Sequence, residues 1–191
     1  MSKDPMSVQE FIEVLLSPQR LEQLDPYDVL MQLPIDPHHQ IADVGCGPGY
    51  FAIPLAKYLS YGKLYALDIE DQMLEALRKR VGATKLGNVE ILKCGETEFP
   101  LPEGSVDGLL LAFVVHQCQD RLAFLKAAAK LLKATGWCCV LEWYRKDNQG
   151  GPPLEKRIEA DEMTALASAA GLRLLRQRNI KDRQYMLLFD R

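Results

Sequence analysis

The first feature of the sequence that could do chemistry is a glycine-rich turn in the stretch IADVGCGPGYF, residues 41–51. Gly45, Gly47 and Gly49 alternate with other residues after a short apolar run that ends at Val44. Glycine adopts positive φ at little cost and has no side chain, so a small molecule can lie against the backbone of such a turn. We therefore expect a ligand-binding turn, although a tight strand-to-helix connection without a ligand would use the same glycines.

A carboxylate follows the next apolar run at a spacing that suits a nucleoside. Asp68 ends the run KLYALD, nineteen residues after Gly49. An acidic side chain at the end of the second strand can accept hydrogen bonds from the hydroxyls of a ribose. Because a helix pattern follows at once, a helix-capping role for Asp68 is the alternative. Together, the turn and Asp68 favour an adenosine-type ligand.

The spacing of the glycines separates two kinds of adenosine ligand. A dinucleotide-binding turn has the pattern GxGxxG, with a pyrophosphate facing the N-terminus of the helix. Here the pattern is GxGxG, and Tyr50 occupies the position of the third glycine. Asp43 adds a negative charge beside the turn, which repels a pyrophosphate and attracts an amino group or a sulfonium. The sequence therefore favours S-adenosylmethionine over NAD, and an NAD-dependent oxidoreductase is the alternative.

The elements that must position these residues alternate between strand and helix. Apolar runs without polar alternation are typical of strands covered on both faces, and helices between strands indicate a parallel sheet. The last two strand patterns are separated only by the segment KDR, so the final strand must run antiparallel. We expect strands at residues 40–45, 63–68, 88–93, 106–115, 137–143, 172–180 and 184–191, and helices at residues 50–60, 70–80, 120–133 and 159–171.

Two helices are expected before the first strand. Ser7 and Glu10 form a capping box that begins the first of them. Asp25 and Pro26 begin the second, which we expect to run through Leu33. The expected buried face of the first helix comprises Phe11, Val14 and Leu15, and the expected stops of two later helices are Gly136 and Gly171.

Length and composition limit the class of protein. The chain has 191 residues, of which 48% are hydrophobic and 26% charged, with a formal net charge of −3. These values predict one ordinary globular domain and give no electrostatic reason for binding nucleic acid. The longest apolar runs are far shorter than the ~20 residues of a membrane span, and the first residues lack the apolar core of a signal peptide. The five cysteines form no CxxC pair, so we expect reduced thiols in a cytoplasmic protein.

Four segments resemble, in order, the signatures of class I S-adenosylmethionine-dependent methyltransferases: IADVGCGPGYFAIPLA, LYALDIEDQML, FPLPEGSVDGLLLAFVVH and AAAKLLKATGWCCVLEW. The most similar branch is the group of small UbiE-like enzymes, also called methyltransferase type 11. The resemblance implies a Rossmann-like α/β fold, with a seven-stranded, mainly parallel sheet, an antiparallel C-terminal strand, helices on both faces and an N-terminal helical extension. We expect residues 1–37 to form a helical lid segment and residues 38–191 to form one compact cofactor-binding domain.

The resemblance also implies binding roles for matching positions. The glycine turn and Asp43 would hold the methionine part of S-adenosylmethionine, Asp68 the ribose, and Ile69 and Met73 the adenine. The family usually has an aspartate where Gly95 stands, and here the neighbouring Glu96 would have to take the place of that aspartate. The cofactor-binding residues expected in all are Asp43, Gly45, Cys46, Gly47, Gly49, Tyr50, Asp68, Ile69, Met73, Gly95, Glu96, Thr97, Ala112 and Phe113.

His116 follows the fourth predicted strand, where the resemblance places the methyl-transfer site. Its imidazole could take a proton from an attacking oxygen or nitrogen, or it could only order the cofactor or pack under a loop. Tyr27, Trp143 and Arg145 are expected to contact the acceptor, although the last two could also belong to a solvated loop. We predict methyl transfer to a small aromatic or lipid-like acceptor, with S-adenosyl-L-homocysteine as product. A non-catalytic S-adenosylmethionine-binding protein is a further alternative.

Three cysteines raise the question of a metal or metalloid. Cys46, Cys94 and Cys118 all fall near the expected cofactor edge of the sheet. Arsenic methyltransferases share the fold and bind the metalloid through several thiolates, but these positions do not match their pattern. The spacing also lacks the paired ligands of a zinc site. We therefore expect no metal, and no partner beyond the small-molecule acceptor.

Overall fold

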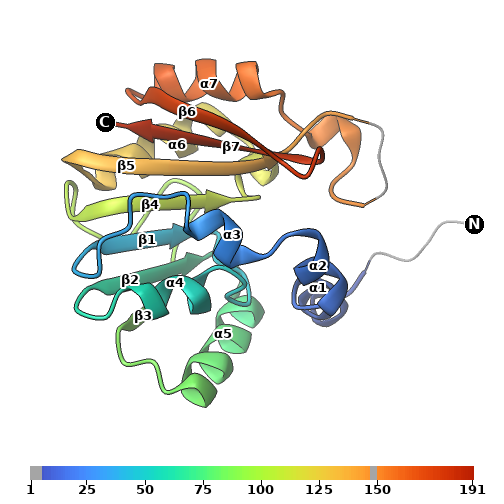
Figure 1. Ribbon diagram of the computed structural model, residues 1–191, viewed down its shortest axis with the longest axis vertical. Helices are drawn as coiled ribbons and strands as arrows, with labels where there is room; N and C mark the ends of the chain where they lie inside the picture. Colours follow the sequence, from blue (N-terminus) through green and yellow to red (C-terminus); the bar gives the residue numbers. More distant parts are fainter. Residues whose placement is uncertain (1–5, 147–149) are drawn as a thin grey trace, which may run out of the picture.

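The computed structural model of the protein describes residues 6–146 and 150–191 (Figure 1). The first five residues of the expected lid segment, and residues 147–149 of the link after the fifth strand, lie outside the described residues. The helices are α1 (Val8–Leu15), α2 (Pro18–Gln23), α3 (Pro26–Leu30), α4 (Ala52–Tyr58), α5 (Asp71–Thr84), α6 (Arg121–Leu131) and α7 (Ala160–Ala169). The strands are β1 (Gln40–Val44), β2 (Lys63–Asp68), β3 (Val89–Lys93), β4 (Val106–Ala112), β5 (Leu132–Trp143), β6 (Arg173–Ile180) and β7 (Gln184–Asp190).

All of these strands belong to one sheet with the order β3-β2-β1-β4-β5-β7-β6. Strand β1 pairs in parallel with both β2 and β4, so the direction of winding reverses between β1 and β4. Strand β7 pairs antiparallel with β5 and with β6, which confirms the predicted closing hairpin. In Figure 1 the strands β1, β2 and β4 point towards α1 and α2. Ligands of open parallel sheets bind at this edge, beside the reversal point.

Helices cover the two faces of the sheet and bury separate apolar clusters. Residues of α3, α4 and α5 pack against one face, and residues of α6 and α7 pack against the other. Successive residues of a strand point to opposite faces, and the fully buried Cys138 and Cys139 accordingly belong to different clusters. The predicted α/β fold with helices on both faces is therefore confirmed, and it fixes which strand residues face which helices.

The boundary between α6 and β5 differs from the prediction. Helix α6 ends at Leu131, and β5 begins at the next residue, so Gly136 lies inside a strand and is not a helix stop. A Cβ on Gly136 would lie 2.9 Å from the Leu132 side chain and 3.1 Å from the Lys133 carbonyl oxygen. The close backbone approach therefore favours a glycine here, and a single sequence cannot separate this preference from a helix stop. The predicted stop at Gly171, with φ of +86°, is in place after α7.

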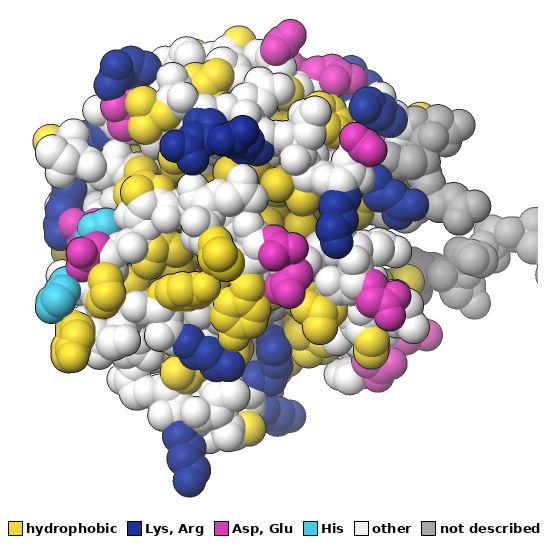
Figure 2. Space-filling model, viewed as in Figure 1, with side chains coloured by type: hydrophobic (Ala, Val, Ile, Leu, Met, Phe, Trp, Pro, Cys, Tyr) yellow, Lys and Arg dark blue, Asp and Glu magenta, His cyan; other side chains and the backbone are white. Residues whose placement is uncertain are grey.

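The N-terminal helices bury different residues from those expected. The capping box of Ser7 and Glu10 is present, but Ile12 is the buried residue of α1, and Phe11 and Val14 are 40% and 50% exposed. The expected face is wrong because the main packing partner of α1 is α5. Figure 2 shows hydrophobic side chains across the face that carries the N-terminal helices. The large exposed apolar side chains of residues 6–31 are Met6, Phe11, Val14, Leu21, Tyr27 and Met31.

Two further expectations need correction. The helix expected from Pro26 through Leu33 ends at Leu30, and α2, capped by the Ser17 hydroxyl, precedes it. The last two strands are not equally covered, because β6 is exposed along nearly all of its length whereas β7 is buried. An edge strand needs no apolar partner on its outer side, which explains the arginines of β6. In the described ranges 6–146 and 150–191, no helix has both the length and the apolar character needed to cross a membrane.

Candidate active site

Two of the three turn glycines are required by packing inside the protein. Gly45 and Gly49 have φ of +75° and +85°, a region that favours glycine. A Cβ on Gly45 would lie 2.5 Å from the Val114 side chain, and a Cβ on Gly49 would overlap the Leu77 side chain. The expectation that all three glycines clear space for a ligand is therefore too broad, because at two of them the space is filled by protein atoms.

Gly47 is the glycine that opens onto free space. Its φ is +53°, and the one heavy atom near a Cβ built there is Leu15 Cδ1 of α1, at 3.9 Å. The Gly47 backbone N–H donates to Asp68 Oδ2 at 2.7 Å, and the Glu70 N–H donates to Oδ1 at 2.9 Å. The carboxylate of Asp68 is thus held against the turn, with lone pairs left for further donors. This arrangement fits a ribose lying between the turn and β2.

Asp43 supplies an unused polar atom beneath the turn. The side chain is 1% exposed, and its Oδ2 has no hydrogen-bond partner among the described residues. Burial, with a smaller contribution from the Asp68 carboxylate, raises the pKa of Asp43 to about 8. A buried carboxyl oxygen without a donor is costly, so the site is suited to a ligand that brings a donor. The amino group of S-adenosylmethionine fits this requirement.

Aromatic rings form a wall beside the turn. Tyr50 lies edge-on to Phe51 at 5.4 Å between ring centroids, and Phe113 lies 6.5 Å from Phe51 and 5.4 Å from Trp143. Phe113 has φ of +60°, an uncommon conformation for a bulky residue. Strained backbone of this kind gathers at functional sites. The Arg20 guanidinium of α2 lies 4.1 Å from the Tyr50 ring and 5.7 Å from the Phe113 ring.

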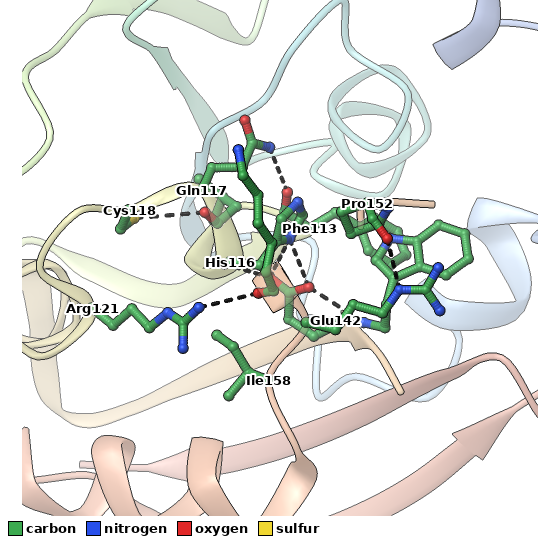
Figure 3. A network of polar contacts seen from close by, with 12 residues as sticks. Phe113, His116, Gln117, Cys118, Arg121, Glu142, Pro152 and Ile158 are labelled. Atoms are coloured by element: carbon green, nitrogen blue, oxygen red, sulfur yellow. Dashed lines mark hydrogen bonds and ion pairs between the residues drawn. The ribbon is translucent and has the colours of Figure 1, made fainter. Parts of the chain in front are cut away.

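His116 is held by a buried carboxylate. Its Nδ1 lies 2.9 Å and 3.0 Å from the two carboxylate oxygens of Glu142, and its backbone N–H donates to Oε1 at 3.1 Å. Glu142 is completely buried in β5 and also accepts from the Trp143 N–H at 3.3 Å. Figure 3 shows this pair next to Phe113, whose carbonyl oxygen accepts from Gln117. The geometry places the proton of a neutral imidazole on Nδ1 and leaves Nε2 as the basic nitrogen.

Glu142 is the site residue that sequence reasoning missed. The signal was present, because it is the lone charged residue in the strand segment WCCVLEW. A carboxylate inside an apolar strand requires buried partners. The partner, however, lies 26 positions away in sequence and becomes evident only from the fold.

The link after β5 is organised by an arginine and not left as a solvated loop. Arg157 is 3% exposed, and its guanidinium donates to the carbonyl oxygens of residues 144, 146, 150 and 152. It also lies 5.7 Å from the Trp143 ring. Arg145 donates twice to the Arg157 carbonyl oxygen, at 2.8 Å and 3.1 Å. Both arginines therefore shape the wall that carries Trp143.

The expected adenine side is assembled in part. Ile69 is 60% exposed directly after Asp68, and Met73 is buried below it. Gly95 follows β3, but the carboxylate of Glu96 accepts from the backbone N–H groups of Gln119 and Asp120 at 3.0 Å and 3.2 Å. The structure therefore gives Glu96 a protein partner in the place of a ligand. Thr97 lines a groove of about 820 Å³ between this loop and α6, which contains no residue of the glycine turn.

The remaining expected residues fall into two groups. Cys46 is buried in the turn, and Ala112 ends β4 immediately before Phe113. Tyr27 stands apart from them, because its ring lies 6.2 Å from the Tyr58 ring at the far end of α4. The structure thus brings together most of the expected residues at one edge of the sheet, and Tyr27 and Thr97 lie outside that group.

The thiols near the site are poorly suited to bind a metalloid. Burial raises the pKa of Cys94 to about 11 and that of Cys118 to about 12, and burial also raises the pKa of Cys46. A thiol binds metals as the thiolate, which these environments disfavour. Residues 6–146 and 150–191 contain no group of three His, Cys, Asp or Glu side chains that could hold a metal ion.

The sheet order, the closing hairpin and the glycine turn next to Asp68 define the class of S-adenosylmethionine-dependent methyltransferases. The model of the methyltransferase domain family matches residues 42–140, more than half of the chain. The chain therefore belongs to this family. Membership favours S-adenosylmethionine as the cofactor over the NAD of the alternative interpretation.

Named relatives agree with this class. A demethylmenaquinone methyltransferase of Geobacillus kaustophilus is 29% identical over 116 residues, which cover 60% of this chain and 50% of that protein. A probable S-adenosylmethionine-dependent methyltransferase of Mycobacterium tuberculosis is 27% identical over 137 residues, covering 69% of this chain and 47% of that protein. The chain thus spans about half the length of the curated relatives that it matches.

Solved structures extend the likeness to nearly the whole chain. A SAM-dependent methyltransferase from Aquifex aeolicus has a TM-score of 0.91 and 28% identity, and the match covers 97% of this chain and 99% of that chain. The [4+2]-cyclase SpnF has a TM-score of 0.78 at 14% identity, with 87% and 80% of the two chains covered. The second likeness shows the fold alone, and its name records a different chemistry on the same scaffold.

Proposed function

We propose that this chain transfers a methyl group from S-adenosylmethionine to a small planar organic acceptor bound beside Phe113 and Trp143. The observation that supports this proposal most strongly is that Gly47, Asp68 and the unpartnered oxygen of Asp43 lie together at the reversal point of the sheet. When bound, S-adenosylmethionine supplies an electrophilic methyl group. The chain's task is then to hold the acceptor in line and to exclude water, which accounts for about 7–11 kcal/mol of barrier lowering in well-oriented systems.

The proposed binding roles follow from the contacts at the turn. Asp68 accepts hydrogen bonds from the ribose, since its carboxylate is already fixed by two backbone N–H groups. Asp43 accepts from the amino group through its unused oxygen. Ile69 offers an exposed apolar surface to the adenine. Gly47 allows the close approach of the ligand to the backbone.

We assign His116 the role of the base that accepts a proton from the acceptor. Glu142 fixes the ring through Nδ1 and stabilises the imidazolium that forms when Nε2 takes the proton. The pair is shielded from solvent, because His116 is 9% exposed and Glu142 is completely buried. A hydroxyl or an acidic carbon on the acceptor would make use of this base.

The aromatic wall and the relatives together suggest the class of acceptor. The rings of Phe113 and Trp143 lie 5.4 Å apart in the aromatic wall, and rings of this kind pack well against a planar substrate. One relative is named a demethylmenaquinone methyltransferase. We therefore propose a phenolic or quinol-like acceptor, which is a finer statement of the aromatic or lipid-like acceptor predicted from the sequence.

A transfer assay tests this proposal. The purified protein is incubated with S-adenosylmethionine carrying a labelled methyl group, and with a panel of catechols, hydroquinones and naphthohydroquinones or with a metabolite extract. We expect a labelled product with the native protein and with D71N, whose carboxylate is exposed, and none with D68N. Failure of the folded native protein to label any acceptor, despite binding the cofactor, would favour a non-catalytic binding protein.

A further inference from the structure

Arg20 is a half-buried cation that lies beside two aromatic rings of the candidate active site. It belongs to α2, and its guanidinium carbon lies 4.1 Å from the centroid of the Tyr50 ring and 5.7 Å from that of Phe113. The Tyr50 hydroxyl donates to the Leu24 carbonyl oxygen just beyond α2. This bond ties α2 to the glycine turn and fixes where the guanidinium lies.

Most of the N–H donors of the Arg20 side chain have no hydrogen-bond partner among the described residues. Its Nη1 donates to the Leu15 carbonyl oxygen at 3.0 Å, and no carboxylate of the described part of the chain forms an ion pair with it. By contrast, Arg121 and Arg173 each pair with an acid. Burial lowers the pKa of Arg20 to about 10, so it remains charged at neutral pH. A half-buried guanidinium with several unused donors can bind an anion through them.

We propose that Arg20 binds the carboxylate of a small molecule in the candidate active site. A guanidinium fork matches a carboxylate through two parallel hydrogen bonds, and the aromatic rings on either side restrict the plane of that fork. The carboxylate of Asp68, at the same edge of the sheet, disfavours a doubly charged phosphate there. The inference rests on the proposed function, because Tyr50 and Phe113 belong to the aromatic wall beside which that function places the acceptor.

Two bound molecules could supply this carboxylate, namely the amino-acid end of the cofactor and the methyl acceptor. The first source is tested by calorimetry with S-adenosylhomocysteine and with 5′-methylthioadenosine, which lacks the amino-acid end. If Arg20 holds the cofactor, R20M weakens binding of S-adenosylhomocysteine by about ten- to a hundredfold and leaves binding of methylthioadenosine within about twofold. The affinity of R20K for S-adenosylhomocysteine should lie between those of the native protein and R20M, because lysine keeps the charge but not the forked pair of donors.

The second source is tested with the cofactor site saturated by S-adenosylhomocysteine. Benzoate and benzamide are nearly equal in shape, and only benzoate carries a charge, so quenching of tryptophan fluorescence compares their affinities. If Arg20 holds the acceptor, the native protein prefers benzoate and R20M loses this preference, whereas the affinity for S-adenosylhomocysteine is unchanged. The matched control is R78M, which removes an arginine that is 50% exposed on α5.

The outcomes separate this proposal from the one on which it rests. Arg20 is supported as the anion-binding residue if R20M loses affinity for S-adenosylhomocysteine but not for methylthioadenosine, or if R20M loses the preference for benzoate over benzamide. The experiment in which the loss occurs identifies the source of the anion. Equal weakening of S-adenosylhomocysteine and methylthioadenosine in R20M, without loss of the benzoate preference, means a merely structural role and overturns the proposal. Unchanged affinities in both arms overturn it too. If the native protein binds neither nucleoside, the proposed function fails first.

Discussion

His116 Nδ1 lies 2.9 Å from Glu142 Oε2, and the backbone N–H of the same histidine donates to the other carboxylate oxygen at 3.1 Å. The histidine follows β4 and the glutamate lies in β5, and these two strands pair in parallel. The sheet therefore fixes both residues, and the imidazole Nδ1 and the backbone N–H of His116 are held by one carboxylate. A buried carboxylate is tolerated through such partners, so the pairing restricts the ring to one orientation.

The first prediction concerns this pair. We expect H116Q to lower kcat by about a hundredfold or more, because a positioned acid–base group contributes about 10²–10⁴-fold. E142Q keeps the shape of the side chain but removes its charge, and should lower kcat by about tenfold. In both variants the affinity for S-adenosylhomocysteine, measured by calorimetry, should stay within about twofold of the native value. Full activity of H116Q would remove the histidine from the mechanism.

The second prediction separates the glycines. G47A adds a methyl group in open space at a positive φ, so it should cost about 1–2 kcal/mol of stability. G49A adds the same strain and also overlaps the Leu77 side chain, so it should melt at a lower temperature than G47A. Thermal unfolding followed by circular dichroism compares them. A melting temperature of G49A equal to that of G47A would mean that the packing around Gly49 is looser than described.

The third prediction is a dependence of stability on pH. Burial and the Asp68 carboxylate raise the pKa of Asp43 to about 8 in the folded state, compared with about 3.9 in an unfolded chain. Because the folded protein then holds a proton that the unfolded chain releases, this contribution to stability is complete below about pH 4 and is lost as the pH rises through about 8. For one proton the slope is at most about 1.4 kcal/mol per pH unit.

The variant D43N checks this dependence. We expect the melting temperature of the ligand-free native protein to fall as the pH is raised across this range, and the fall to be smaller in D43N. D71N, which removes an exposed carboxylate, is the matched control and should follow the native curve. An equal fall in D43N and the native protein would show that Asp43 is already ionised when folded.

The fourth prediction concerns the link after β5. Arg157 holds four backbone carbonyl groups of residues 144–152, and lysine cannot reproduce this branched set of donors. R157K should therefore lower the free energy of unfolding by about 2 kcal/mol, the scale of a few lost hydrogen bonds. It should also speed proteolytic cleavage within the link. R178M on the exposed strand β6 is the control, and equal cleavage rates in both variants would contradict the assigned role.

Local patterns made much of the fold and part of the site predictable. The glycine turn, the strand that ends at Asp68 and the closing hairpin each depend on spacing along a short segment, and all three are present. The predicted helix stop at Gly136 was wrong, because a glycine between a helix pattern and a strand pattern can belong to either element. The face of α1 failed because its packing partner, α5, follows more than fifty residues later.

Long-range contacts explain what the sequence could not show. Glu142 is significant because of His116, which lies 26 positions away in the sequence. Glu96 was expected to face the adenine, but its carboxylate binds backbone groups ahead of α6. Packing around Gly45 and Gly49 likewise depends on Val114 and Leu77, which lie on distant segments. Such requirements come from tertiary structure and leave no periodic signal in a single sequence.

The most direct test of the central claim is calorimetric titration of the purified native protein and of D68N with S-adenosylhomocysteine and with NAD. We expect the native protein to bind S-adenosylhomocysteine and not NAD, and D68N to bind S-adenosylhomocysteine at least about tenfold more weakly. A folded native protein that does not bind S-adenosylhomocysteine, or that binds NAD more tightly, would show that the glycine turn and Asp68 do not form a site for this nucleoside.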